Sequence, residues 1–383
     1  MIGRKMIGRK MARQSATRGQ LLPAAQGYRM PAEWEPHEST WLAWPHFRGD
    51  WPGKFEPVPW VYAEIVRNLA QHERVDLIVN DASGEKRARA VLEKAGALSA
   101  NIYFYHWRTD RVWTRDSGCI FLTPPPERHH EERHHEDHAD SGLLALHFQF
   151  NAWAKYPNYK CDEKVGERMA KTSGVRLVQP FSKKHRVVLE GGSIDVNGCG
   201  TLLTTEECLL STTQQRNPPM DRAAYDQLFA DYFGAQSVIW LDSGITGDDT
   251  HGHVDDITRF VAPNTVVTMI EQNEQNENYA PLHANLGRLK NARTSDGQKL
   301  EIVEIPMPRP VVFEGRQLPA SYANFYIANG TVLVPVFNDP NDRIALNSLA
   351  ELFPTREIVP IYSGDLIWGF GALHCMTQQQ PGK

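Results

Sequence analysis

The chain has 383 residues, of which 41% are hydrophobic and 23% charged, proportions that are ordinary for a globular protein with a substantial core. Its net charge of −5 argues against a nucleic-acid partner, and no stretch of 18 apolar residues is present to cross a membrane. Five scattered cysteines without a C-x-x-C pair argue against a disulfide framework and a cysteine zinc site, and they favour a reducing, cytoplasmic location.

The N-terminal segment 1–29 is predicted to be a disordered tail. It repeats MIGRK at Met1–Lys5 and Met6–Lys10, and it holds basic residues but no acidic one. A secretory signal would need an apolar core of about 7–15 residues after the basic start, and none follows. We therefore expect a single domain over residues 30–383.

A histidine-rich run, Glu127–Asp140 (ERHHEERHHEDHAD), contains five of the fifteen histidines. Imidazoles at this density bind Zn²⁺, Ni²⁺ or Cu²⁺, so a metal-binding protein is one hypothesis. Almost every other residue of the run is charged and three prolines precede it, which is typical of a solvated loop. Residues 124–141 are therefore predicted to be a surface loop.

Strand-like apolar runs recur about every 64 residues, which indicates an internal repeat. Turn signals such as Asn197-Gly198 and Asn329-Gly330 precede several runs and predict hairpins. Stretches with apolar residues at helical spacing lie between the hairpins. The apolar runs are Val75–Val79, Leu143–Phe150, Thr201–Thr205, Thr265–Ile270 and Thr331–Phe337, and the helical stretches are Pro59–His72, Asp162–Ser173, Asp221–Phe233 and Leu282–Thr294.

Five units of strand, turn, strand and helix predict an α/β fold in which small units must pack on one another. Closing them into a ring would remove exposed sheet edges, so we predict a five-bladed, pseudo-symmetric α/β propeller. Two ordinary α/β domains in tandem are the alternative.

Reactive side chains stand at or just before the first strand of successive hairpins. Each one alone has an ordinary structural explanation, such as a salt bridge or a buried apolar thiol. Matching positions in a ring would instead converge on its axis and form one acidic pocket with a histidine and a cysteine. The groups are Trp113-Thr114-Arg115-Asp116, Glu190-Gly191-Gly192, His253-Val254-Asp255, Ser321-Tyr322 and His374-Cys375.

A pocket of this composition suits a cation, because carboxylates would repel the oxyanion that forms in ester or peptide hydrolysis. A guanidinium is planar, permanently charged and matched to carboxylate oxygens. We expect its central carbon to face a thiolate, with Trp113 as a cation–π wall and His253 donating and accepting protons. A papain-like protease fits less well, because its cysteine typically precedes its histidine in the chain.

Several segments together resemble the agmatine deiminases, which belong with the bacterial peptidylarginine deiminases in the guanidine-modifying superfamily. The resemblance runs from about Met30 to the C-terminus and implies a pentein-type propeller. It also implies hydrolysis of agmatine to N-carbamoylputrescine and ammonia, without a metal or an organic cofactor. The segments are Met30–Pro45 (MPAEWEPHESTWLAWP), Val112–Gly118 (VWTRDSG), Leu189–Ile194 (LEGGSI), Gly247–Asp256 (GDDTHGHVDD), Asn338–Asp342 (NDPND) and His374–Pro381 (HCMTQQQP).

The resemblance further implies a role for each matching residue. Cys375 would be the nucleophile and form a covalent thiouronium, with His253 as general acid and base. Asp116 and Asp255 would hold the guanidinium, and Glu190 would lie beside His253 and the substrate.

The identity of the substrate is less constrained than the chemistry. The far ammonium of agmatine would need an acid, for which Asp248 and Asp249 are candidates. The stretch Gly369–Leu373 (GFGAL) departs from the family's Gly-Gly-Gly-Asn-Ile, and the bulky Phe370 would reshape the pocket floor. Peptidylarginine or another arginine derivative is therefore the alternative substrate. The expected partner is a small-molecule guanidine, and a homo-oligomer is compatible with the sequence.

Overall fold

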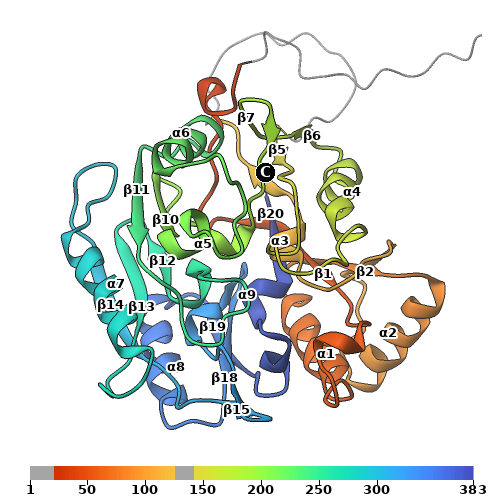
Figure 1. Ribbon diagram of the computed structural model, residues 1–383. Coiled ribbons are helices and arrows are strands. Elements are labelled where there is room, and N and C mark those ends of the chain that lie inside the picture. Colours follow the sequence, from red (N-terminus) through yellow and green to blue (C-terminus); the bar gives the residue numbers. More distant parts are fainter. Residues whose placement is uncertain (1–20, 126–141, 383) are drawn as a thin grey trace, which may run out of the picture.

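The computed structural model describes residues 21–125 and 142–382 (Figure 1). Nearly all of the predicted histidine-rich loop and most of the predicted tail lie outside these residues. Residues 24–26 form the 3-10 helix η1 (Ala24–Gln26), and Arg29 pairs with Thr123 in an isolated bridge. Regular structure therefore begins before Met30.

Within these described residues, five mixed sheets share one pattern, in which an antiparallel pair of strands continues into a strand parallel to the second of the pair. In the first sheet β20 (Thr377–Pro381) pairs antiparallel with β1 (His37–Ala43), and β2 (Arg74–Val79) and β3 (Ile102–His106) follow in parallel. The others are β4 (Ile120–Leu122), β5 (Leu144–Leu146) and β6 (Arg176–Val178); β9 (Asp195–Val196), β10 (Thr201–Thr205) and β11 (Ser237–Leu241); β12 (Thr258–Ala262), β13 (Thr265–Ile270) and β14 (Glu301–Pro306); and β17 (Tyr326–Ile327), β18 (Thr331–Val336) and β19 (Glu357–Tyr362).

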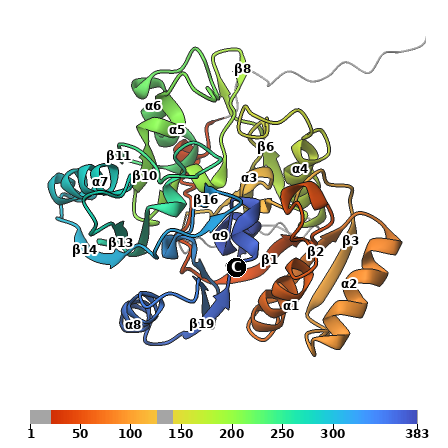
Figure 2. The same cartoon turned by 60° about the horizontal axis from the view of Figure 1, so that its bottom comes forward.

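Helices connect the parallel strands of each sheet, as such crossovers require. Figure 2 shows them around the rim, with α9 (Leu373–Met376) in the middle of the molecule. The connecting helices are α1 (Val58–Leu69), α2 (Ala82–Lys94), α4 (Val165–Thr172), α5 (Glu206–Leu210), α6 (Arg222–Phe233), α7 (Tyr279–Asn291) and α8 (Asp342–Leu352). Two small hairpins complete the strands, β7 (Phe181–Ser182) with β8 (His185–Arg186) and β15 (Val312–Phe313) with β16 (Arg316–Gln317).

Local sequence signals account for several boundaries. The Asp81 carboxylate caps α2 by accepting from the Gly84 N–H at 2.7 Å, and Asp221 caps α6 in the same way from Ala224 at 2.9 Å. Gly234 ends α6 in the left-handed conformation, with φ of 73°, where a side chain would be strained. All six residues of β13 are buried, as expected for a strand covered on both faces.

The predicted α/β class is confirmed, and most predicted strands and helices lie where the sequence placed them. The run Val75–Val79 is a strand but not the equivalent of the others, because β1 is the strand of its sheet that has an antiparallel neighbour on one side and a parallel neighbour on the other. The five sheets are separate and none closes on itself among residues 21–125 and 142–382. Over the same residues, no helix combines the length and the apolar character needed to span a bilayer.

Candidate active site

Five short helices stand immediately before the first strand of each sheet, and each carries or adjoins a polar group. These helices are α3 (Thr114–Ser117), η4 (Gly191–Ser193), η5 (Val254–Asp256), η6 (Tyr322–Asn324) and α9. Asp116, Glu190, His253 with Asp255, Asn324 and Cys375 belong to them in that order. Each helix contacts the next, and α9 also contacts α3, which brings the five groups together.

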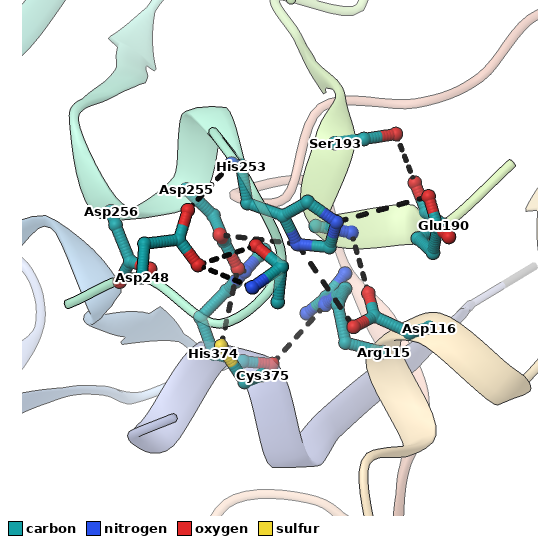
Figure 3. A network of polar contacts seen from close by, with 12 residues as sticks. Arg115, Asp116, Glu190, Ser193, Asp248, His253, Asp255, Asp256, His374 and Cys375 are labelled. Carbon is teal, nitrogen blue, oxygen red and sulfur yellow. Dashed lines mark hydrogen bonds and ion pairs between the residues drawn. The ribbon is translucent and has the colours of Figure 1, made fainter. Parts of the chain in front are cut away.

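His253 lies at the centre of this cluster (Figure 3), fully buried. Its Nδ1 is 4.0 Å from Asp116 Oδ2 and 3.9 Å from Asp255 Oδ1, and its Nε2 is 3.8 Å from Glu190 Oε2. Neither nitrogen has a hydrogen-bond partner among the described residues. Burial alone would lower the pKa of His253, but Asp116 and Glu190 raise it well above its usual value. The ring is therefore held as an imidazolium.

Glu190 fixes one side of this ring. Its Oε1 accepts from Arg216 Nε at 3.0 Å, and both side chains are fully buried. Burial alone would raise the pKa of Glu190, but Arg216 and His253 lower it to about 2. An ionised Glu190 favours a proton on Nε2, the ring nitrogen that faces it. The other ring nitrogen, Nδ1, faces Asp116 and Asp255.

Asp116 is held by two uncharged donors, Trp153 Nε1 at 2.9 Å and the Gly192 N–H at 3.0 Å. A Cβ on Gly192 would lie 2.6 Å from His253 Nδ1, so the backbone can approach this closely only at a glycine. Burial raises the pKa of Asp116 to about 6, and Asp255 and Glu190 add to the rise. Asp116 can therefore exchange a proton near neutral pH.

Asp255 is held differently. Its Oδ2 is bonded to His374 Nδ1 at 2.7 Å, while its Oδ1 has no hydrogen-bond partner among the described residues. Burial alone would raise the pKa of Asp255, but the hydrogen bond and the charge of His374 lower it. Asp255 therefore presents one free, ionised oxygen beside His253.

Cys375 is clamped by Asn324. Asn324 Nδ2 donates to Cys375 Sγ at 3.1 Å, and Asn324 Oδ1 accepts from the Cys375 and His374 N–H groups at 3.3 and 3.0 Å. The sulfur is also 3.6 Å from Asp255 Oδ2. Burial raises the pKa of the Cys375 thiol well above its usual value, and Asp255 and Asp256 raise it further. The sulfur needs a nearby cation before it can ionise at neutral pH.

A cavity of about 260 Å³ leads to this cluster, with Asp116 and Cys375 among its lining residues. Trp113, Trp153, Trp368 and Phe370 supply aromatic walls. Such walls suit a flat cation and an alkyl chain.

Charged groups of both signs lie elsewhere on this cavity wall. Asp249 accepts from Tyr156 Oη at 2.5 Å and pairs with Lys155 at 2.5 Å and with Arg316 at 3.4 Å. Asp50 is hydrogen-bonded to Arg111 through Oδ1, and its buried Oδ2 has no partner among the described residues. Burial raises the pKa of Asp50 to about 7, although Arg111 opposes the rise.

The residues predicted from the sequence all lie in this cluster or on its cavity, and their roles remain predictions. They are Trp113, Asp116, Glu190, Asp249, His253, Asp255 and Cys375. The other candidate, Asp248, instead accepts from the N–H groups of Thr250, Gly252 and His253, so it shapes the loop that carries the histidine.

Four further residues of the cluster and its cavity were not predicted: Glu33, whose Oε2 lies 2.8 Å from His374 Nε2, and Asp50, Arg216 and Asn324. The position of Asn324 in the fourth repeat, three residues after Ser321, was a signal that could have found it. Arg216 reaches Glu190 from a loop outside the repeat pattern, and no spacing rule points to it.

Among residues 21–125 and 142–382, two groups of side chains each bring three potential metal ligands within 4.8 Å of one another: Glu190, Cys208 and His253, and Asp255, Asp256 and Cys375. The Arg216 cation at 3.0 Å from Glu190 opposes a second positive charge at the first group. The expectation that the chemistry uses no metal remains a prediction.

Comparisons with known proteins agree with this geometry. The chain is 33% identical over 382 residues to an agmatine deiminase of Pseudomonas aeruginosa, with 94% of this chain and 97% of the relative covered. The structure of Enterococcus faecalis agmatine deiminase superimposes with a TM-score of 0.83 at 28% identity, covering 95% of this chain and 98% of the other. A Cys-to-Ser variant of C. jejuni agmatine deiminase with substrate bound gives a TM-score of 0.78 at 29% identity, covering 92% and 96%.

The family model for Porphyromonas-type peptidyl-arginine deiminases matches residues 29–381, which is nearly the whole described chain. The chain therefore belongs to this family.

Proposed function

We propose that this protein hydrolyses the guanidinium group of agmatine, giving N-carbamoylputrescine and ammonia. The observation that carries the proposal is the group of atoms around His253. Carboxylate oxygens of Glu190 and Asp255 that have no hydrogen-bond partner in the described part of the chain, both ring nitrogens and a buried thiol face one another beside a cavity. Relatives over almost the full chain are agmatine deiminases, which supports this substrate.

Binding of the substrate activates the nucleophile. The guanidinium lies against the carboxylates of Asp116 and Asp255, and its positive charge lowers the pKa of the adjacent thiol. The Cys375 thiol releases its proton to solvent water through the cavity, and the thiolate sulfur attacks the central guanidinium carbon, which gives a neutral tetrahedral intermediate. His253 then transfers its Nδ1 proton to one amino group, which leaves as ammonia, and a cationic thiouronium remains on the sulfur.

Water completes the reaction. Neutral His253 takes a proton from a water molecule as the oxygen attacks the thiouronium carbon. The C–S bond then breaks, the hydroxyl proton passes to the departing thiolate of Cys375, and the ureido product leaves. The thiol and the imidazolium are restored, so the same nitrogen serves first as an acid and then as a base.

Arginine derivatives are the second candidate substrates, and one feature of the cavity favours them. Arg316 is half-exposed on the cavity wall, and its ion-pair partner Asp249 is shared with Lys155. An incompletely neutralised cation there would suit the carboxylate or carbonyl groups of an arginine derivative better than the ammonium of agmatine.

We also propose that residues 30–383 act as one catalytic domain with the arrangement of a five-bladed propeller, located in the cytoplasm. The repeated strand order of the five sheets and the cyclic contacts of α3, η4, η5, η6 and α9 support the propeller. The cysteines are free among the described residues, which favours a reducing compartment.

The test is ureido-product formation from agmatine, free arginine and a blocked arginine peptide. Wild type is expected to act on agmatine, and Cys375→Ala is expected to lose at least about 10³-fold in kcat. Cys119→Ala is the matched control, because Cys119 is also a buried thiol but is absent from the cavity lining, and it should retain activity. Selective turnover of the peptide or of arginine would instead support the second candidate. A folded wild type that converts none of the three would refute the proposal.

A further inference from the structure

The imidazole of His374 bridges two buried carboxylates. Its Nδ1 is 2.7 Å from Asp255 Oδ2 and its Nε2 is 2.8 Å from Glu33 Oε2. A neutral imidazole has one N–H, whereas an imidazolium can donate to both carboxylates. Cys375 lines the cavity, whereas His374, the residue directly before it, is not among the lining residues, so its ring lies outside the path of a substrate.

Glu33 anchors this ring to three distant parts of the chain. Its carboxylate is 3.2 Å from Arg115 Nη2 and 2.9 Å from Arg259 Nη2, and it accepts from the Ile327 N–H at 2.9 Å. Asp195 also pairs with Arg259. Burial alone would raise the pKa of Glu33, but Arg259 and His374 lower it well below its usual value. Glu33 therefore remains an anion that can hold a cationic ring.

A comparison of Asp116 and Asp255, the two carboxylates next to Nδ1 of His253, shows the effect of the hydrogen bond from His374. Asp116 has only uncharged donors, and its pKa is raised to about 6, whereas Asp255 has His374 and a lowered pKa. The bond from His374 occupies Oδ2 of Asp255 and leaves Oδ1 toward the site, 3.9 Å from His253 Nδ1. The hydrogen bond to Oδ2 of Asp255 thus fixes the carboxylate in the orientation that turns Oδ1 toward the site.

We propose that His374, anchored by Glu33, is the positioning residue of Asp255 and sets the affinity of the site for the substrate guanidinium. The proposal rests on the function proposed above. It assigns Glu33 and His374 no contact with the substrate, so both act through Asp255. The first effect of losing them is weaker binding of the cation, with weaker activation of Cys375 as a consequence.

Two substitutions of His374 distinguish a role in positioning Asp255 from a role in which the side chain only fills space. In His374→Asn the amide nitrogen takes the place of Nδ1 and can still donate to Asp255. In His374→Gln it takes the place of Nε2 and faces Glu33 instead. We expect KM for agmatine to rise about 10- to 100-fold in His374→Gln and less in His374→Asn, with kcat changing less than KM in both. A filling role predicts the reverse order, because glutamine is closer to histidine in size.

A second readout does not depend on turnover. Alkylation of Cys375 is measured with the cation chloroacetamidine and with neutral iodoacetamide. We expect the cationic reagent to be strongly preferred in wild type, partly preferred in His374→Asn and little preferred in His374→Gln. His147→Gln is the control, since His147 is equally buried, at 2% exposure, but bonds the Glu163 carbonyl. The His147→Gln variant should keep the preference for the cationic reagent, whatever the effect of this substitution on stability.

The outcomes are distinct. An unchanged reagent preference and KM in a folded His374→Gln variant would overturn the positioning role. If the reagent preference falls in the His374 variants as expected but wild type does not convert agmatine, the positioning role stands and the proposed substrate is rejected.

Discussion

The ionisation of Asp116 is expected to set the acid side of the pH profile. The pKa of this buried carboxyl is raised to about 6, so it is protonated below that pH and loses its attraction for a guanidinium. We expect kcat/KM to rise with pH through about 6 and to level off above it. His253 has a raised pKa, so the imidazolium persists through this range, and the loss of activity falls on the alkaline side.

The measurement is kcat/KM for agmatine between about pH 4.5 and 9.5, because this parameter reports the free enzyme. Agmatine stays a dication over the acid side of the profile, so the fall in kcat/KM there reports the ionisation of a group on the protein. An acid limb near pH 4, the range of an ordinary carboxyl, would show that protonation of Asp116 does not limit binding.

Sequence reasoning finds the groups that are proposed to react and misses the groups that hold them in place. Cys375, His253 and Asp255 stand at repeated positions, and the chemistry of their side chains is specific enough to suggest a cationic substrate. Asn324 and Glu33 act through hydrogen bonds to residues far away in the chain, from Asn324 to Cys375 and from Glu33 to His374. Such contacts depend on tertiary packing, which neither periodicity nor local spacing encodes.

The segment around η7 (Leu366–Gly369) and the β15–β16 hairpin together form one wall of the cavity. Phe370 follows η7 with φ of 65°, a left-handed conformation that strains a bulky residue by ~1–3 kcal/mol. Its ring lies 4.0 Å from the Arg316 guanidinium carbon of β16. Phe313 of β15 packs edge-on against Trp368 at 4.5 Å between ring centroids. These contacts hold the β15–β16 hairpin against the η7 segment.

Phe370→Gly is expected to widen the cavity and relax its selectivity. Glycine adopts this backbone conformation without strain, so the free energy of unfolding should change by only ~1 kcal/mol as lost contacts offset the gain. We expect KM for agmatine to rise about 10-fold, because aromatic contact with its alkyl chain is lost. Turnover of a blocked arginine peptide should rise relative to that of agmatine.

The ratio of kcat/KM for the two substrates, together with thermal unfolding, checks this prediction. Phe181→Gly is a suitable control, since Phe181 is an exposed residue of the other hairpin, and the ratio should not move. A ratio unchanged in Phe370→Gly would mean that the aromatic ring does not restrict the substrate.

At the scale of the whole molecule, the sequence shows the repeat but does not show that the last strand of the chain pairs with a strand of the first repeat. The strand β20 pairs with β1 and so joins the last repeat to the first. Its sequence, TQQQP, contains no apolar run, although all five residues are buried. Gln379 accepts from Arg115 at 2.7 Å and Gln380 accepts from Ser173 at 2.6 Å. A strand buried through hydrogen bonds leaves no hydrophobic pattern to detect, so the sequence does not show that β20 is the antiparallel partner of β1.

The histidine-rich segment gives the whole-molecule test of the metal-binding hypothesis. Leu122 at the end of β4 pairs with Leu144 at the start of β5, so the chain enters and leaves this segment at neighbouring positions. No residue of the described site lies between Pro125 and Gly142. A variant lacking Glu127–Asp140 is therefore expected to keep kcat and KM for agmatine within about 2-fold, and to lose most Ni²⁺ binding.

Replacing the five histidines of the segment by serine at unchanged length is the matched variant. It should lose Ni²⁺ binding to the same extent and leave turnover unchanged, because the proposed chemistry uses His253 and no imidazole of the segment. Loss of turnover in both folded variants would tie the metal-binding segment to the reaction. Loss in the deletion alone would instead trace the effect to the length of the connection, since the serine variant preserves that length while removing the imidazoles.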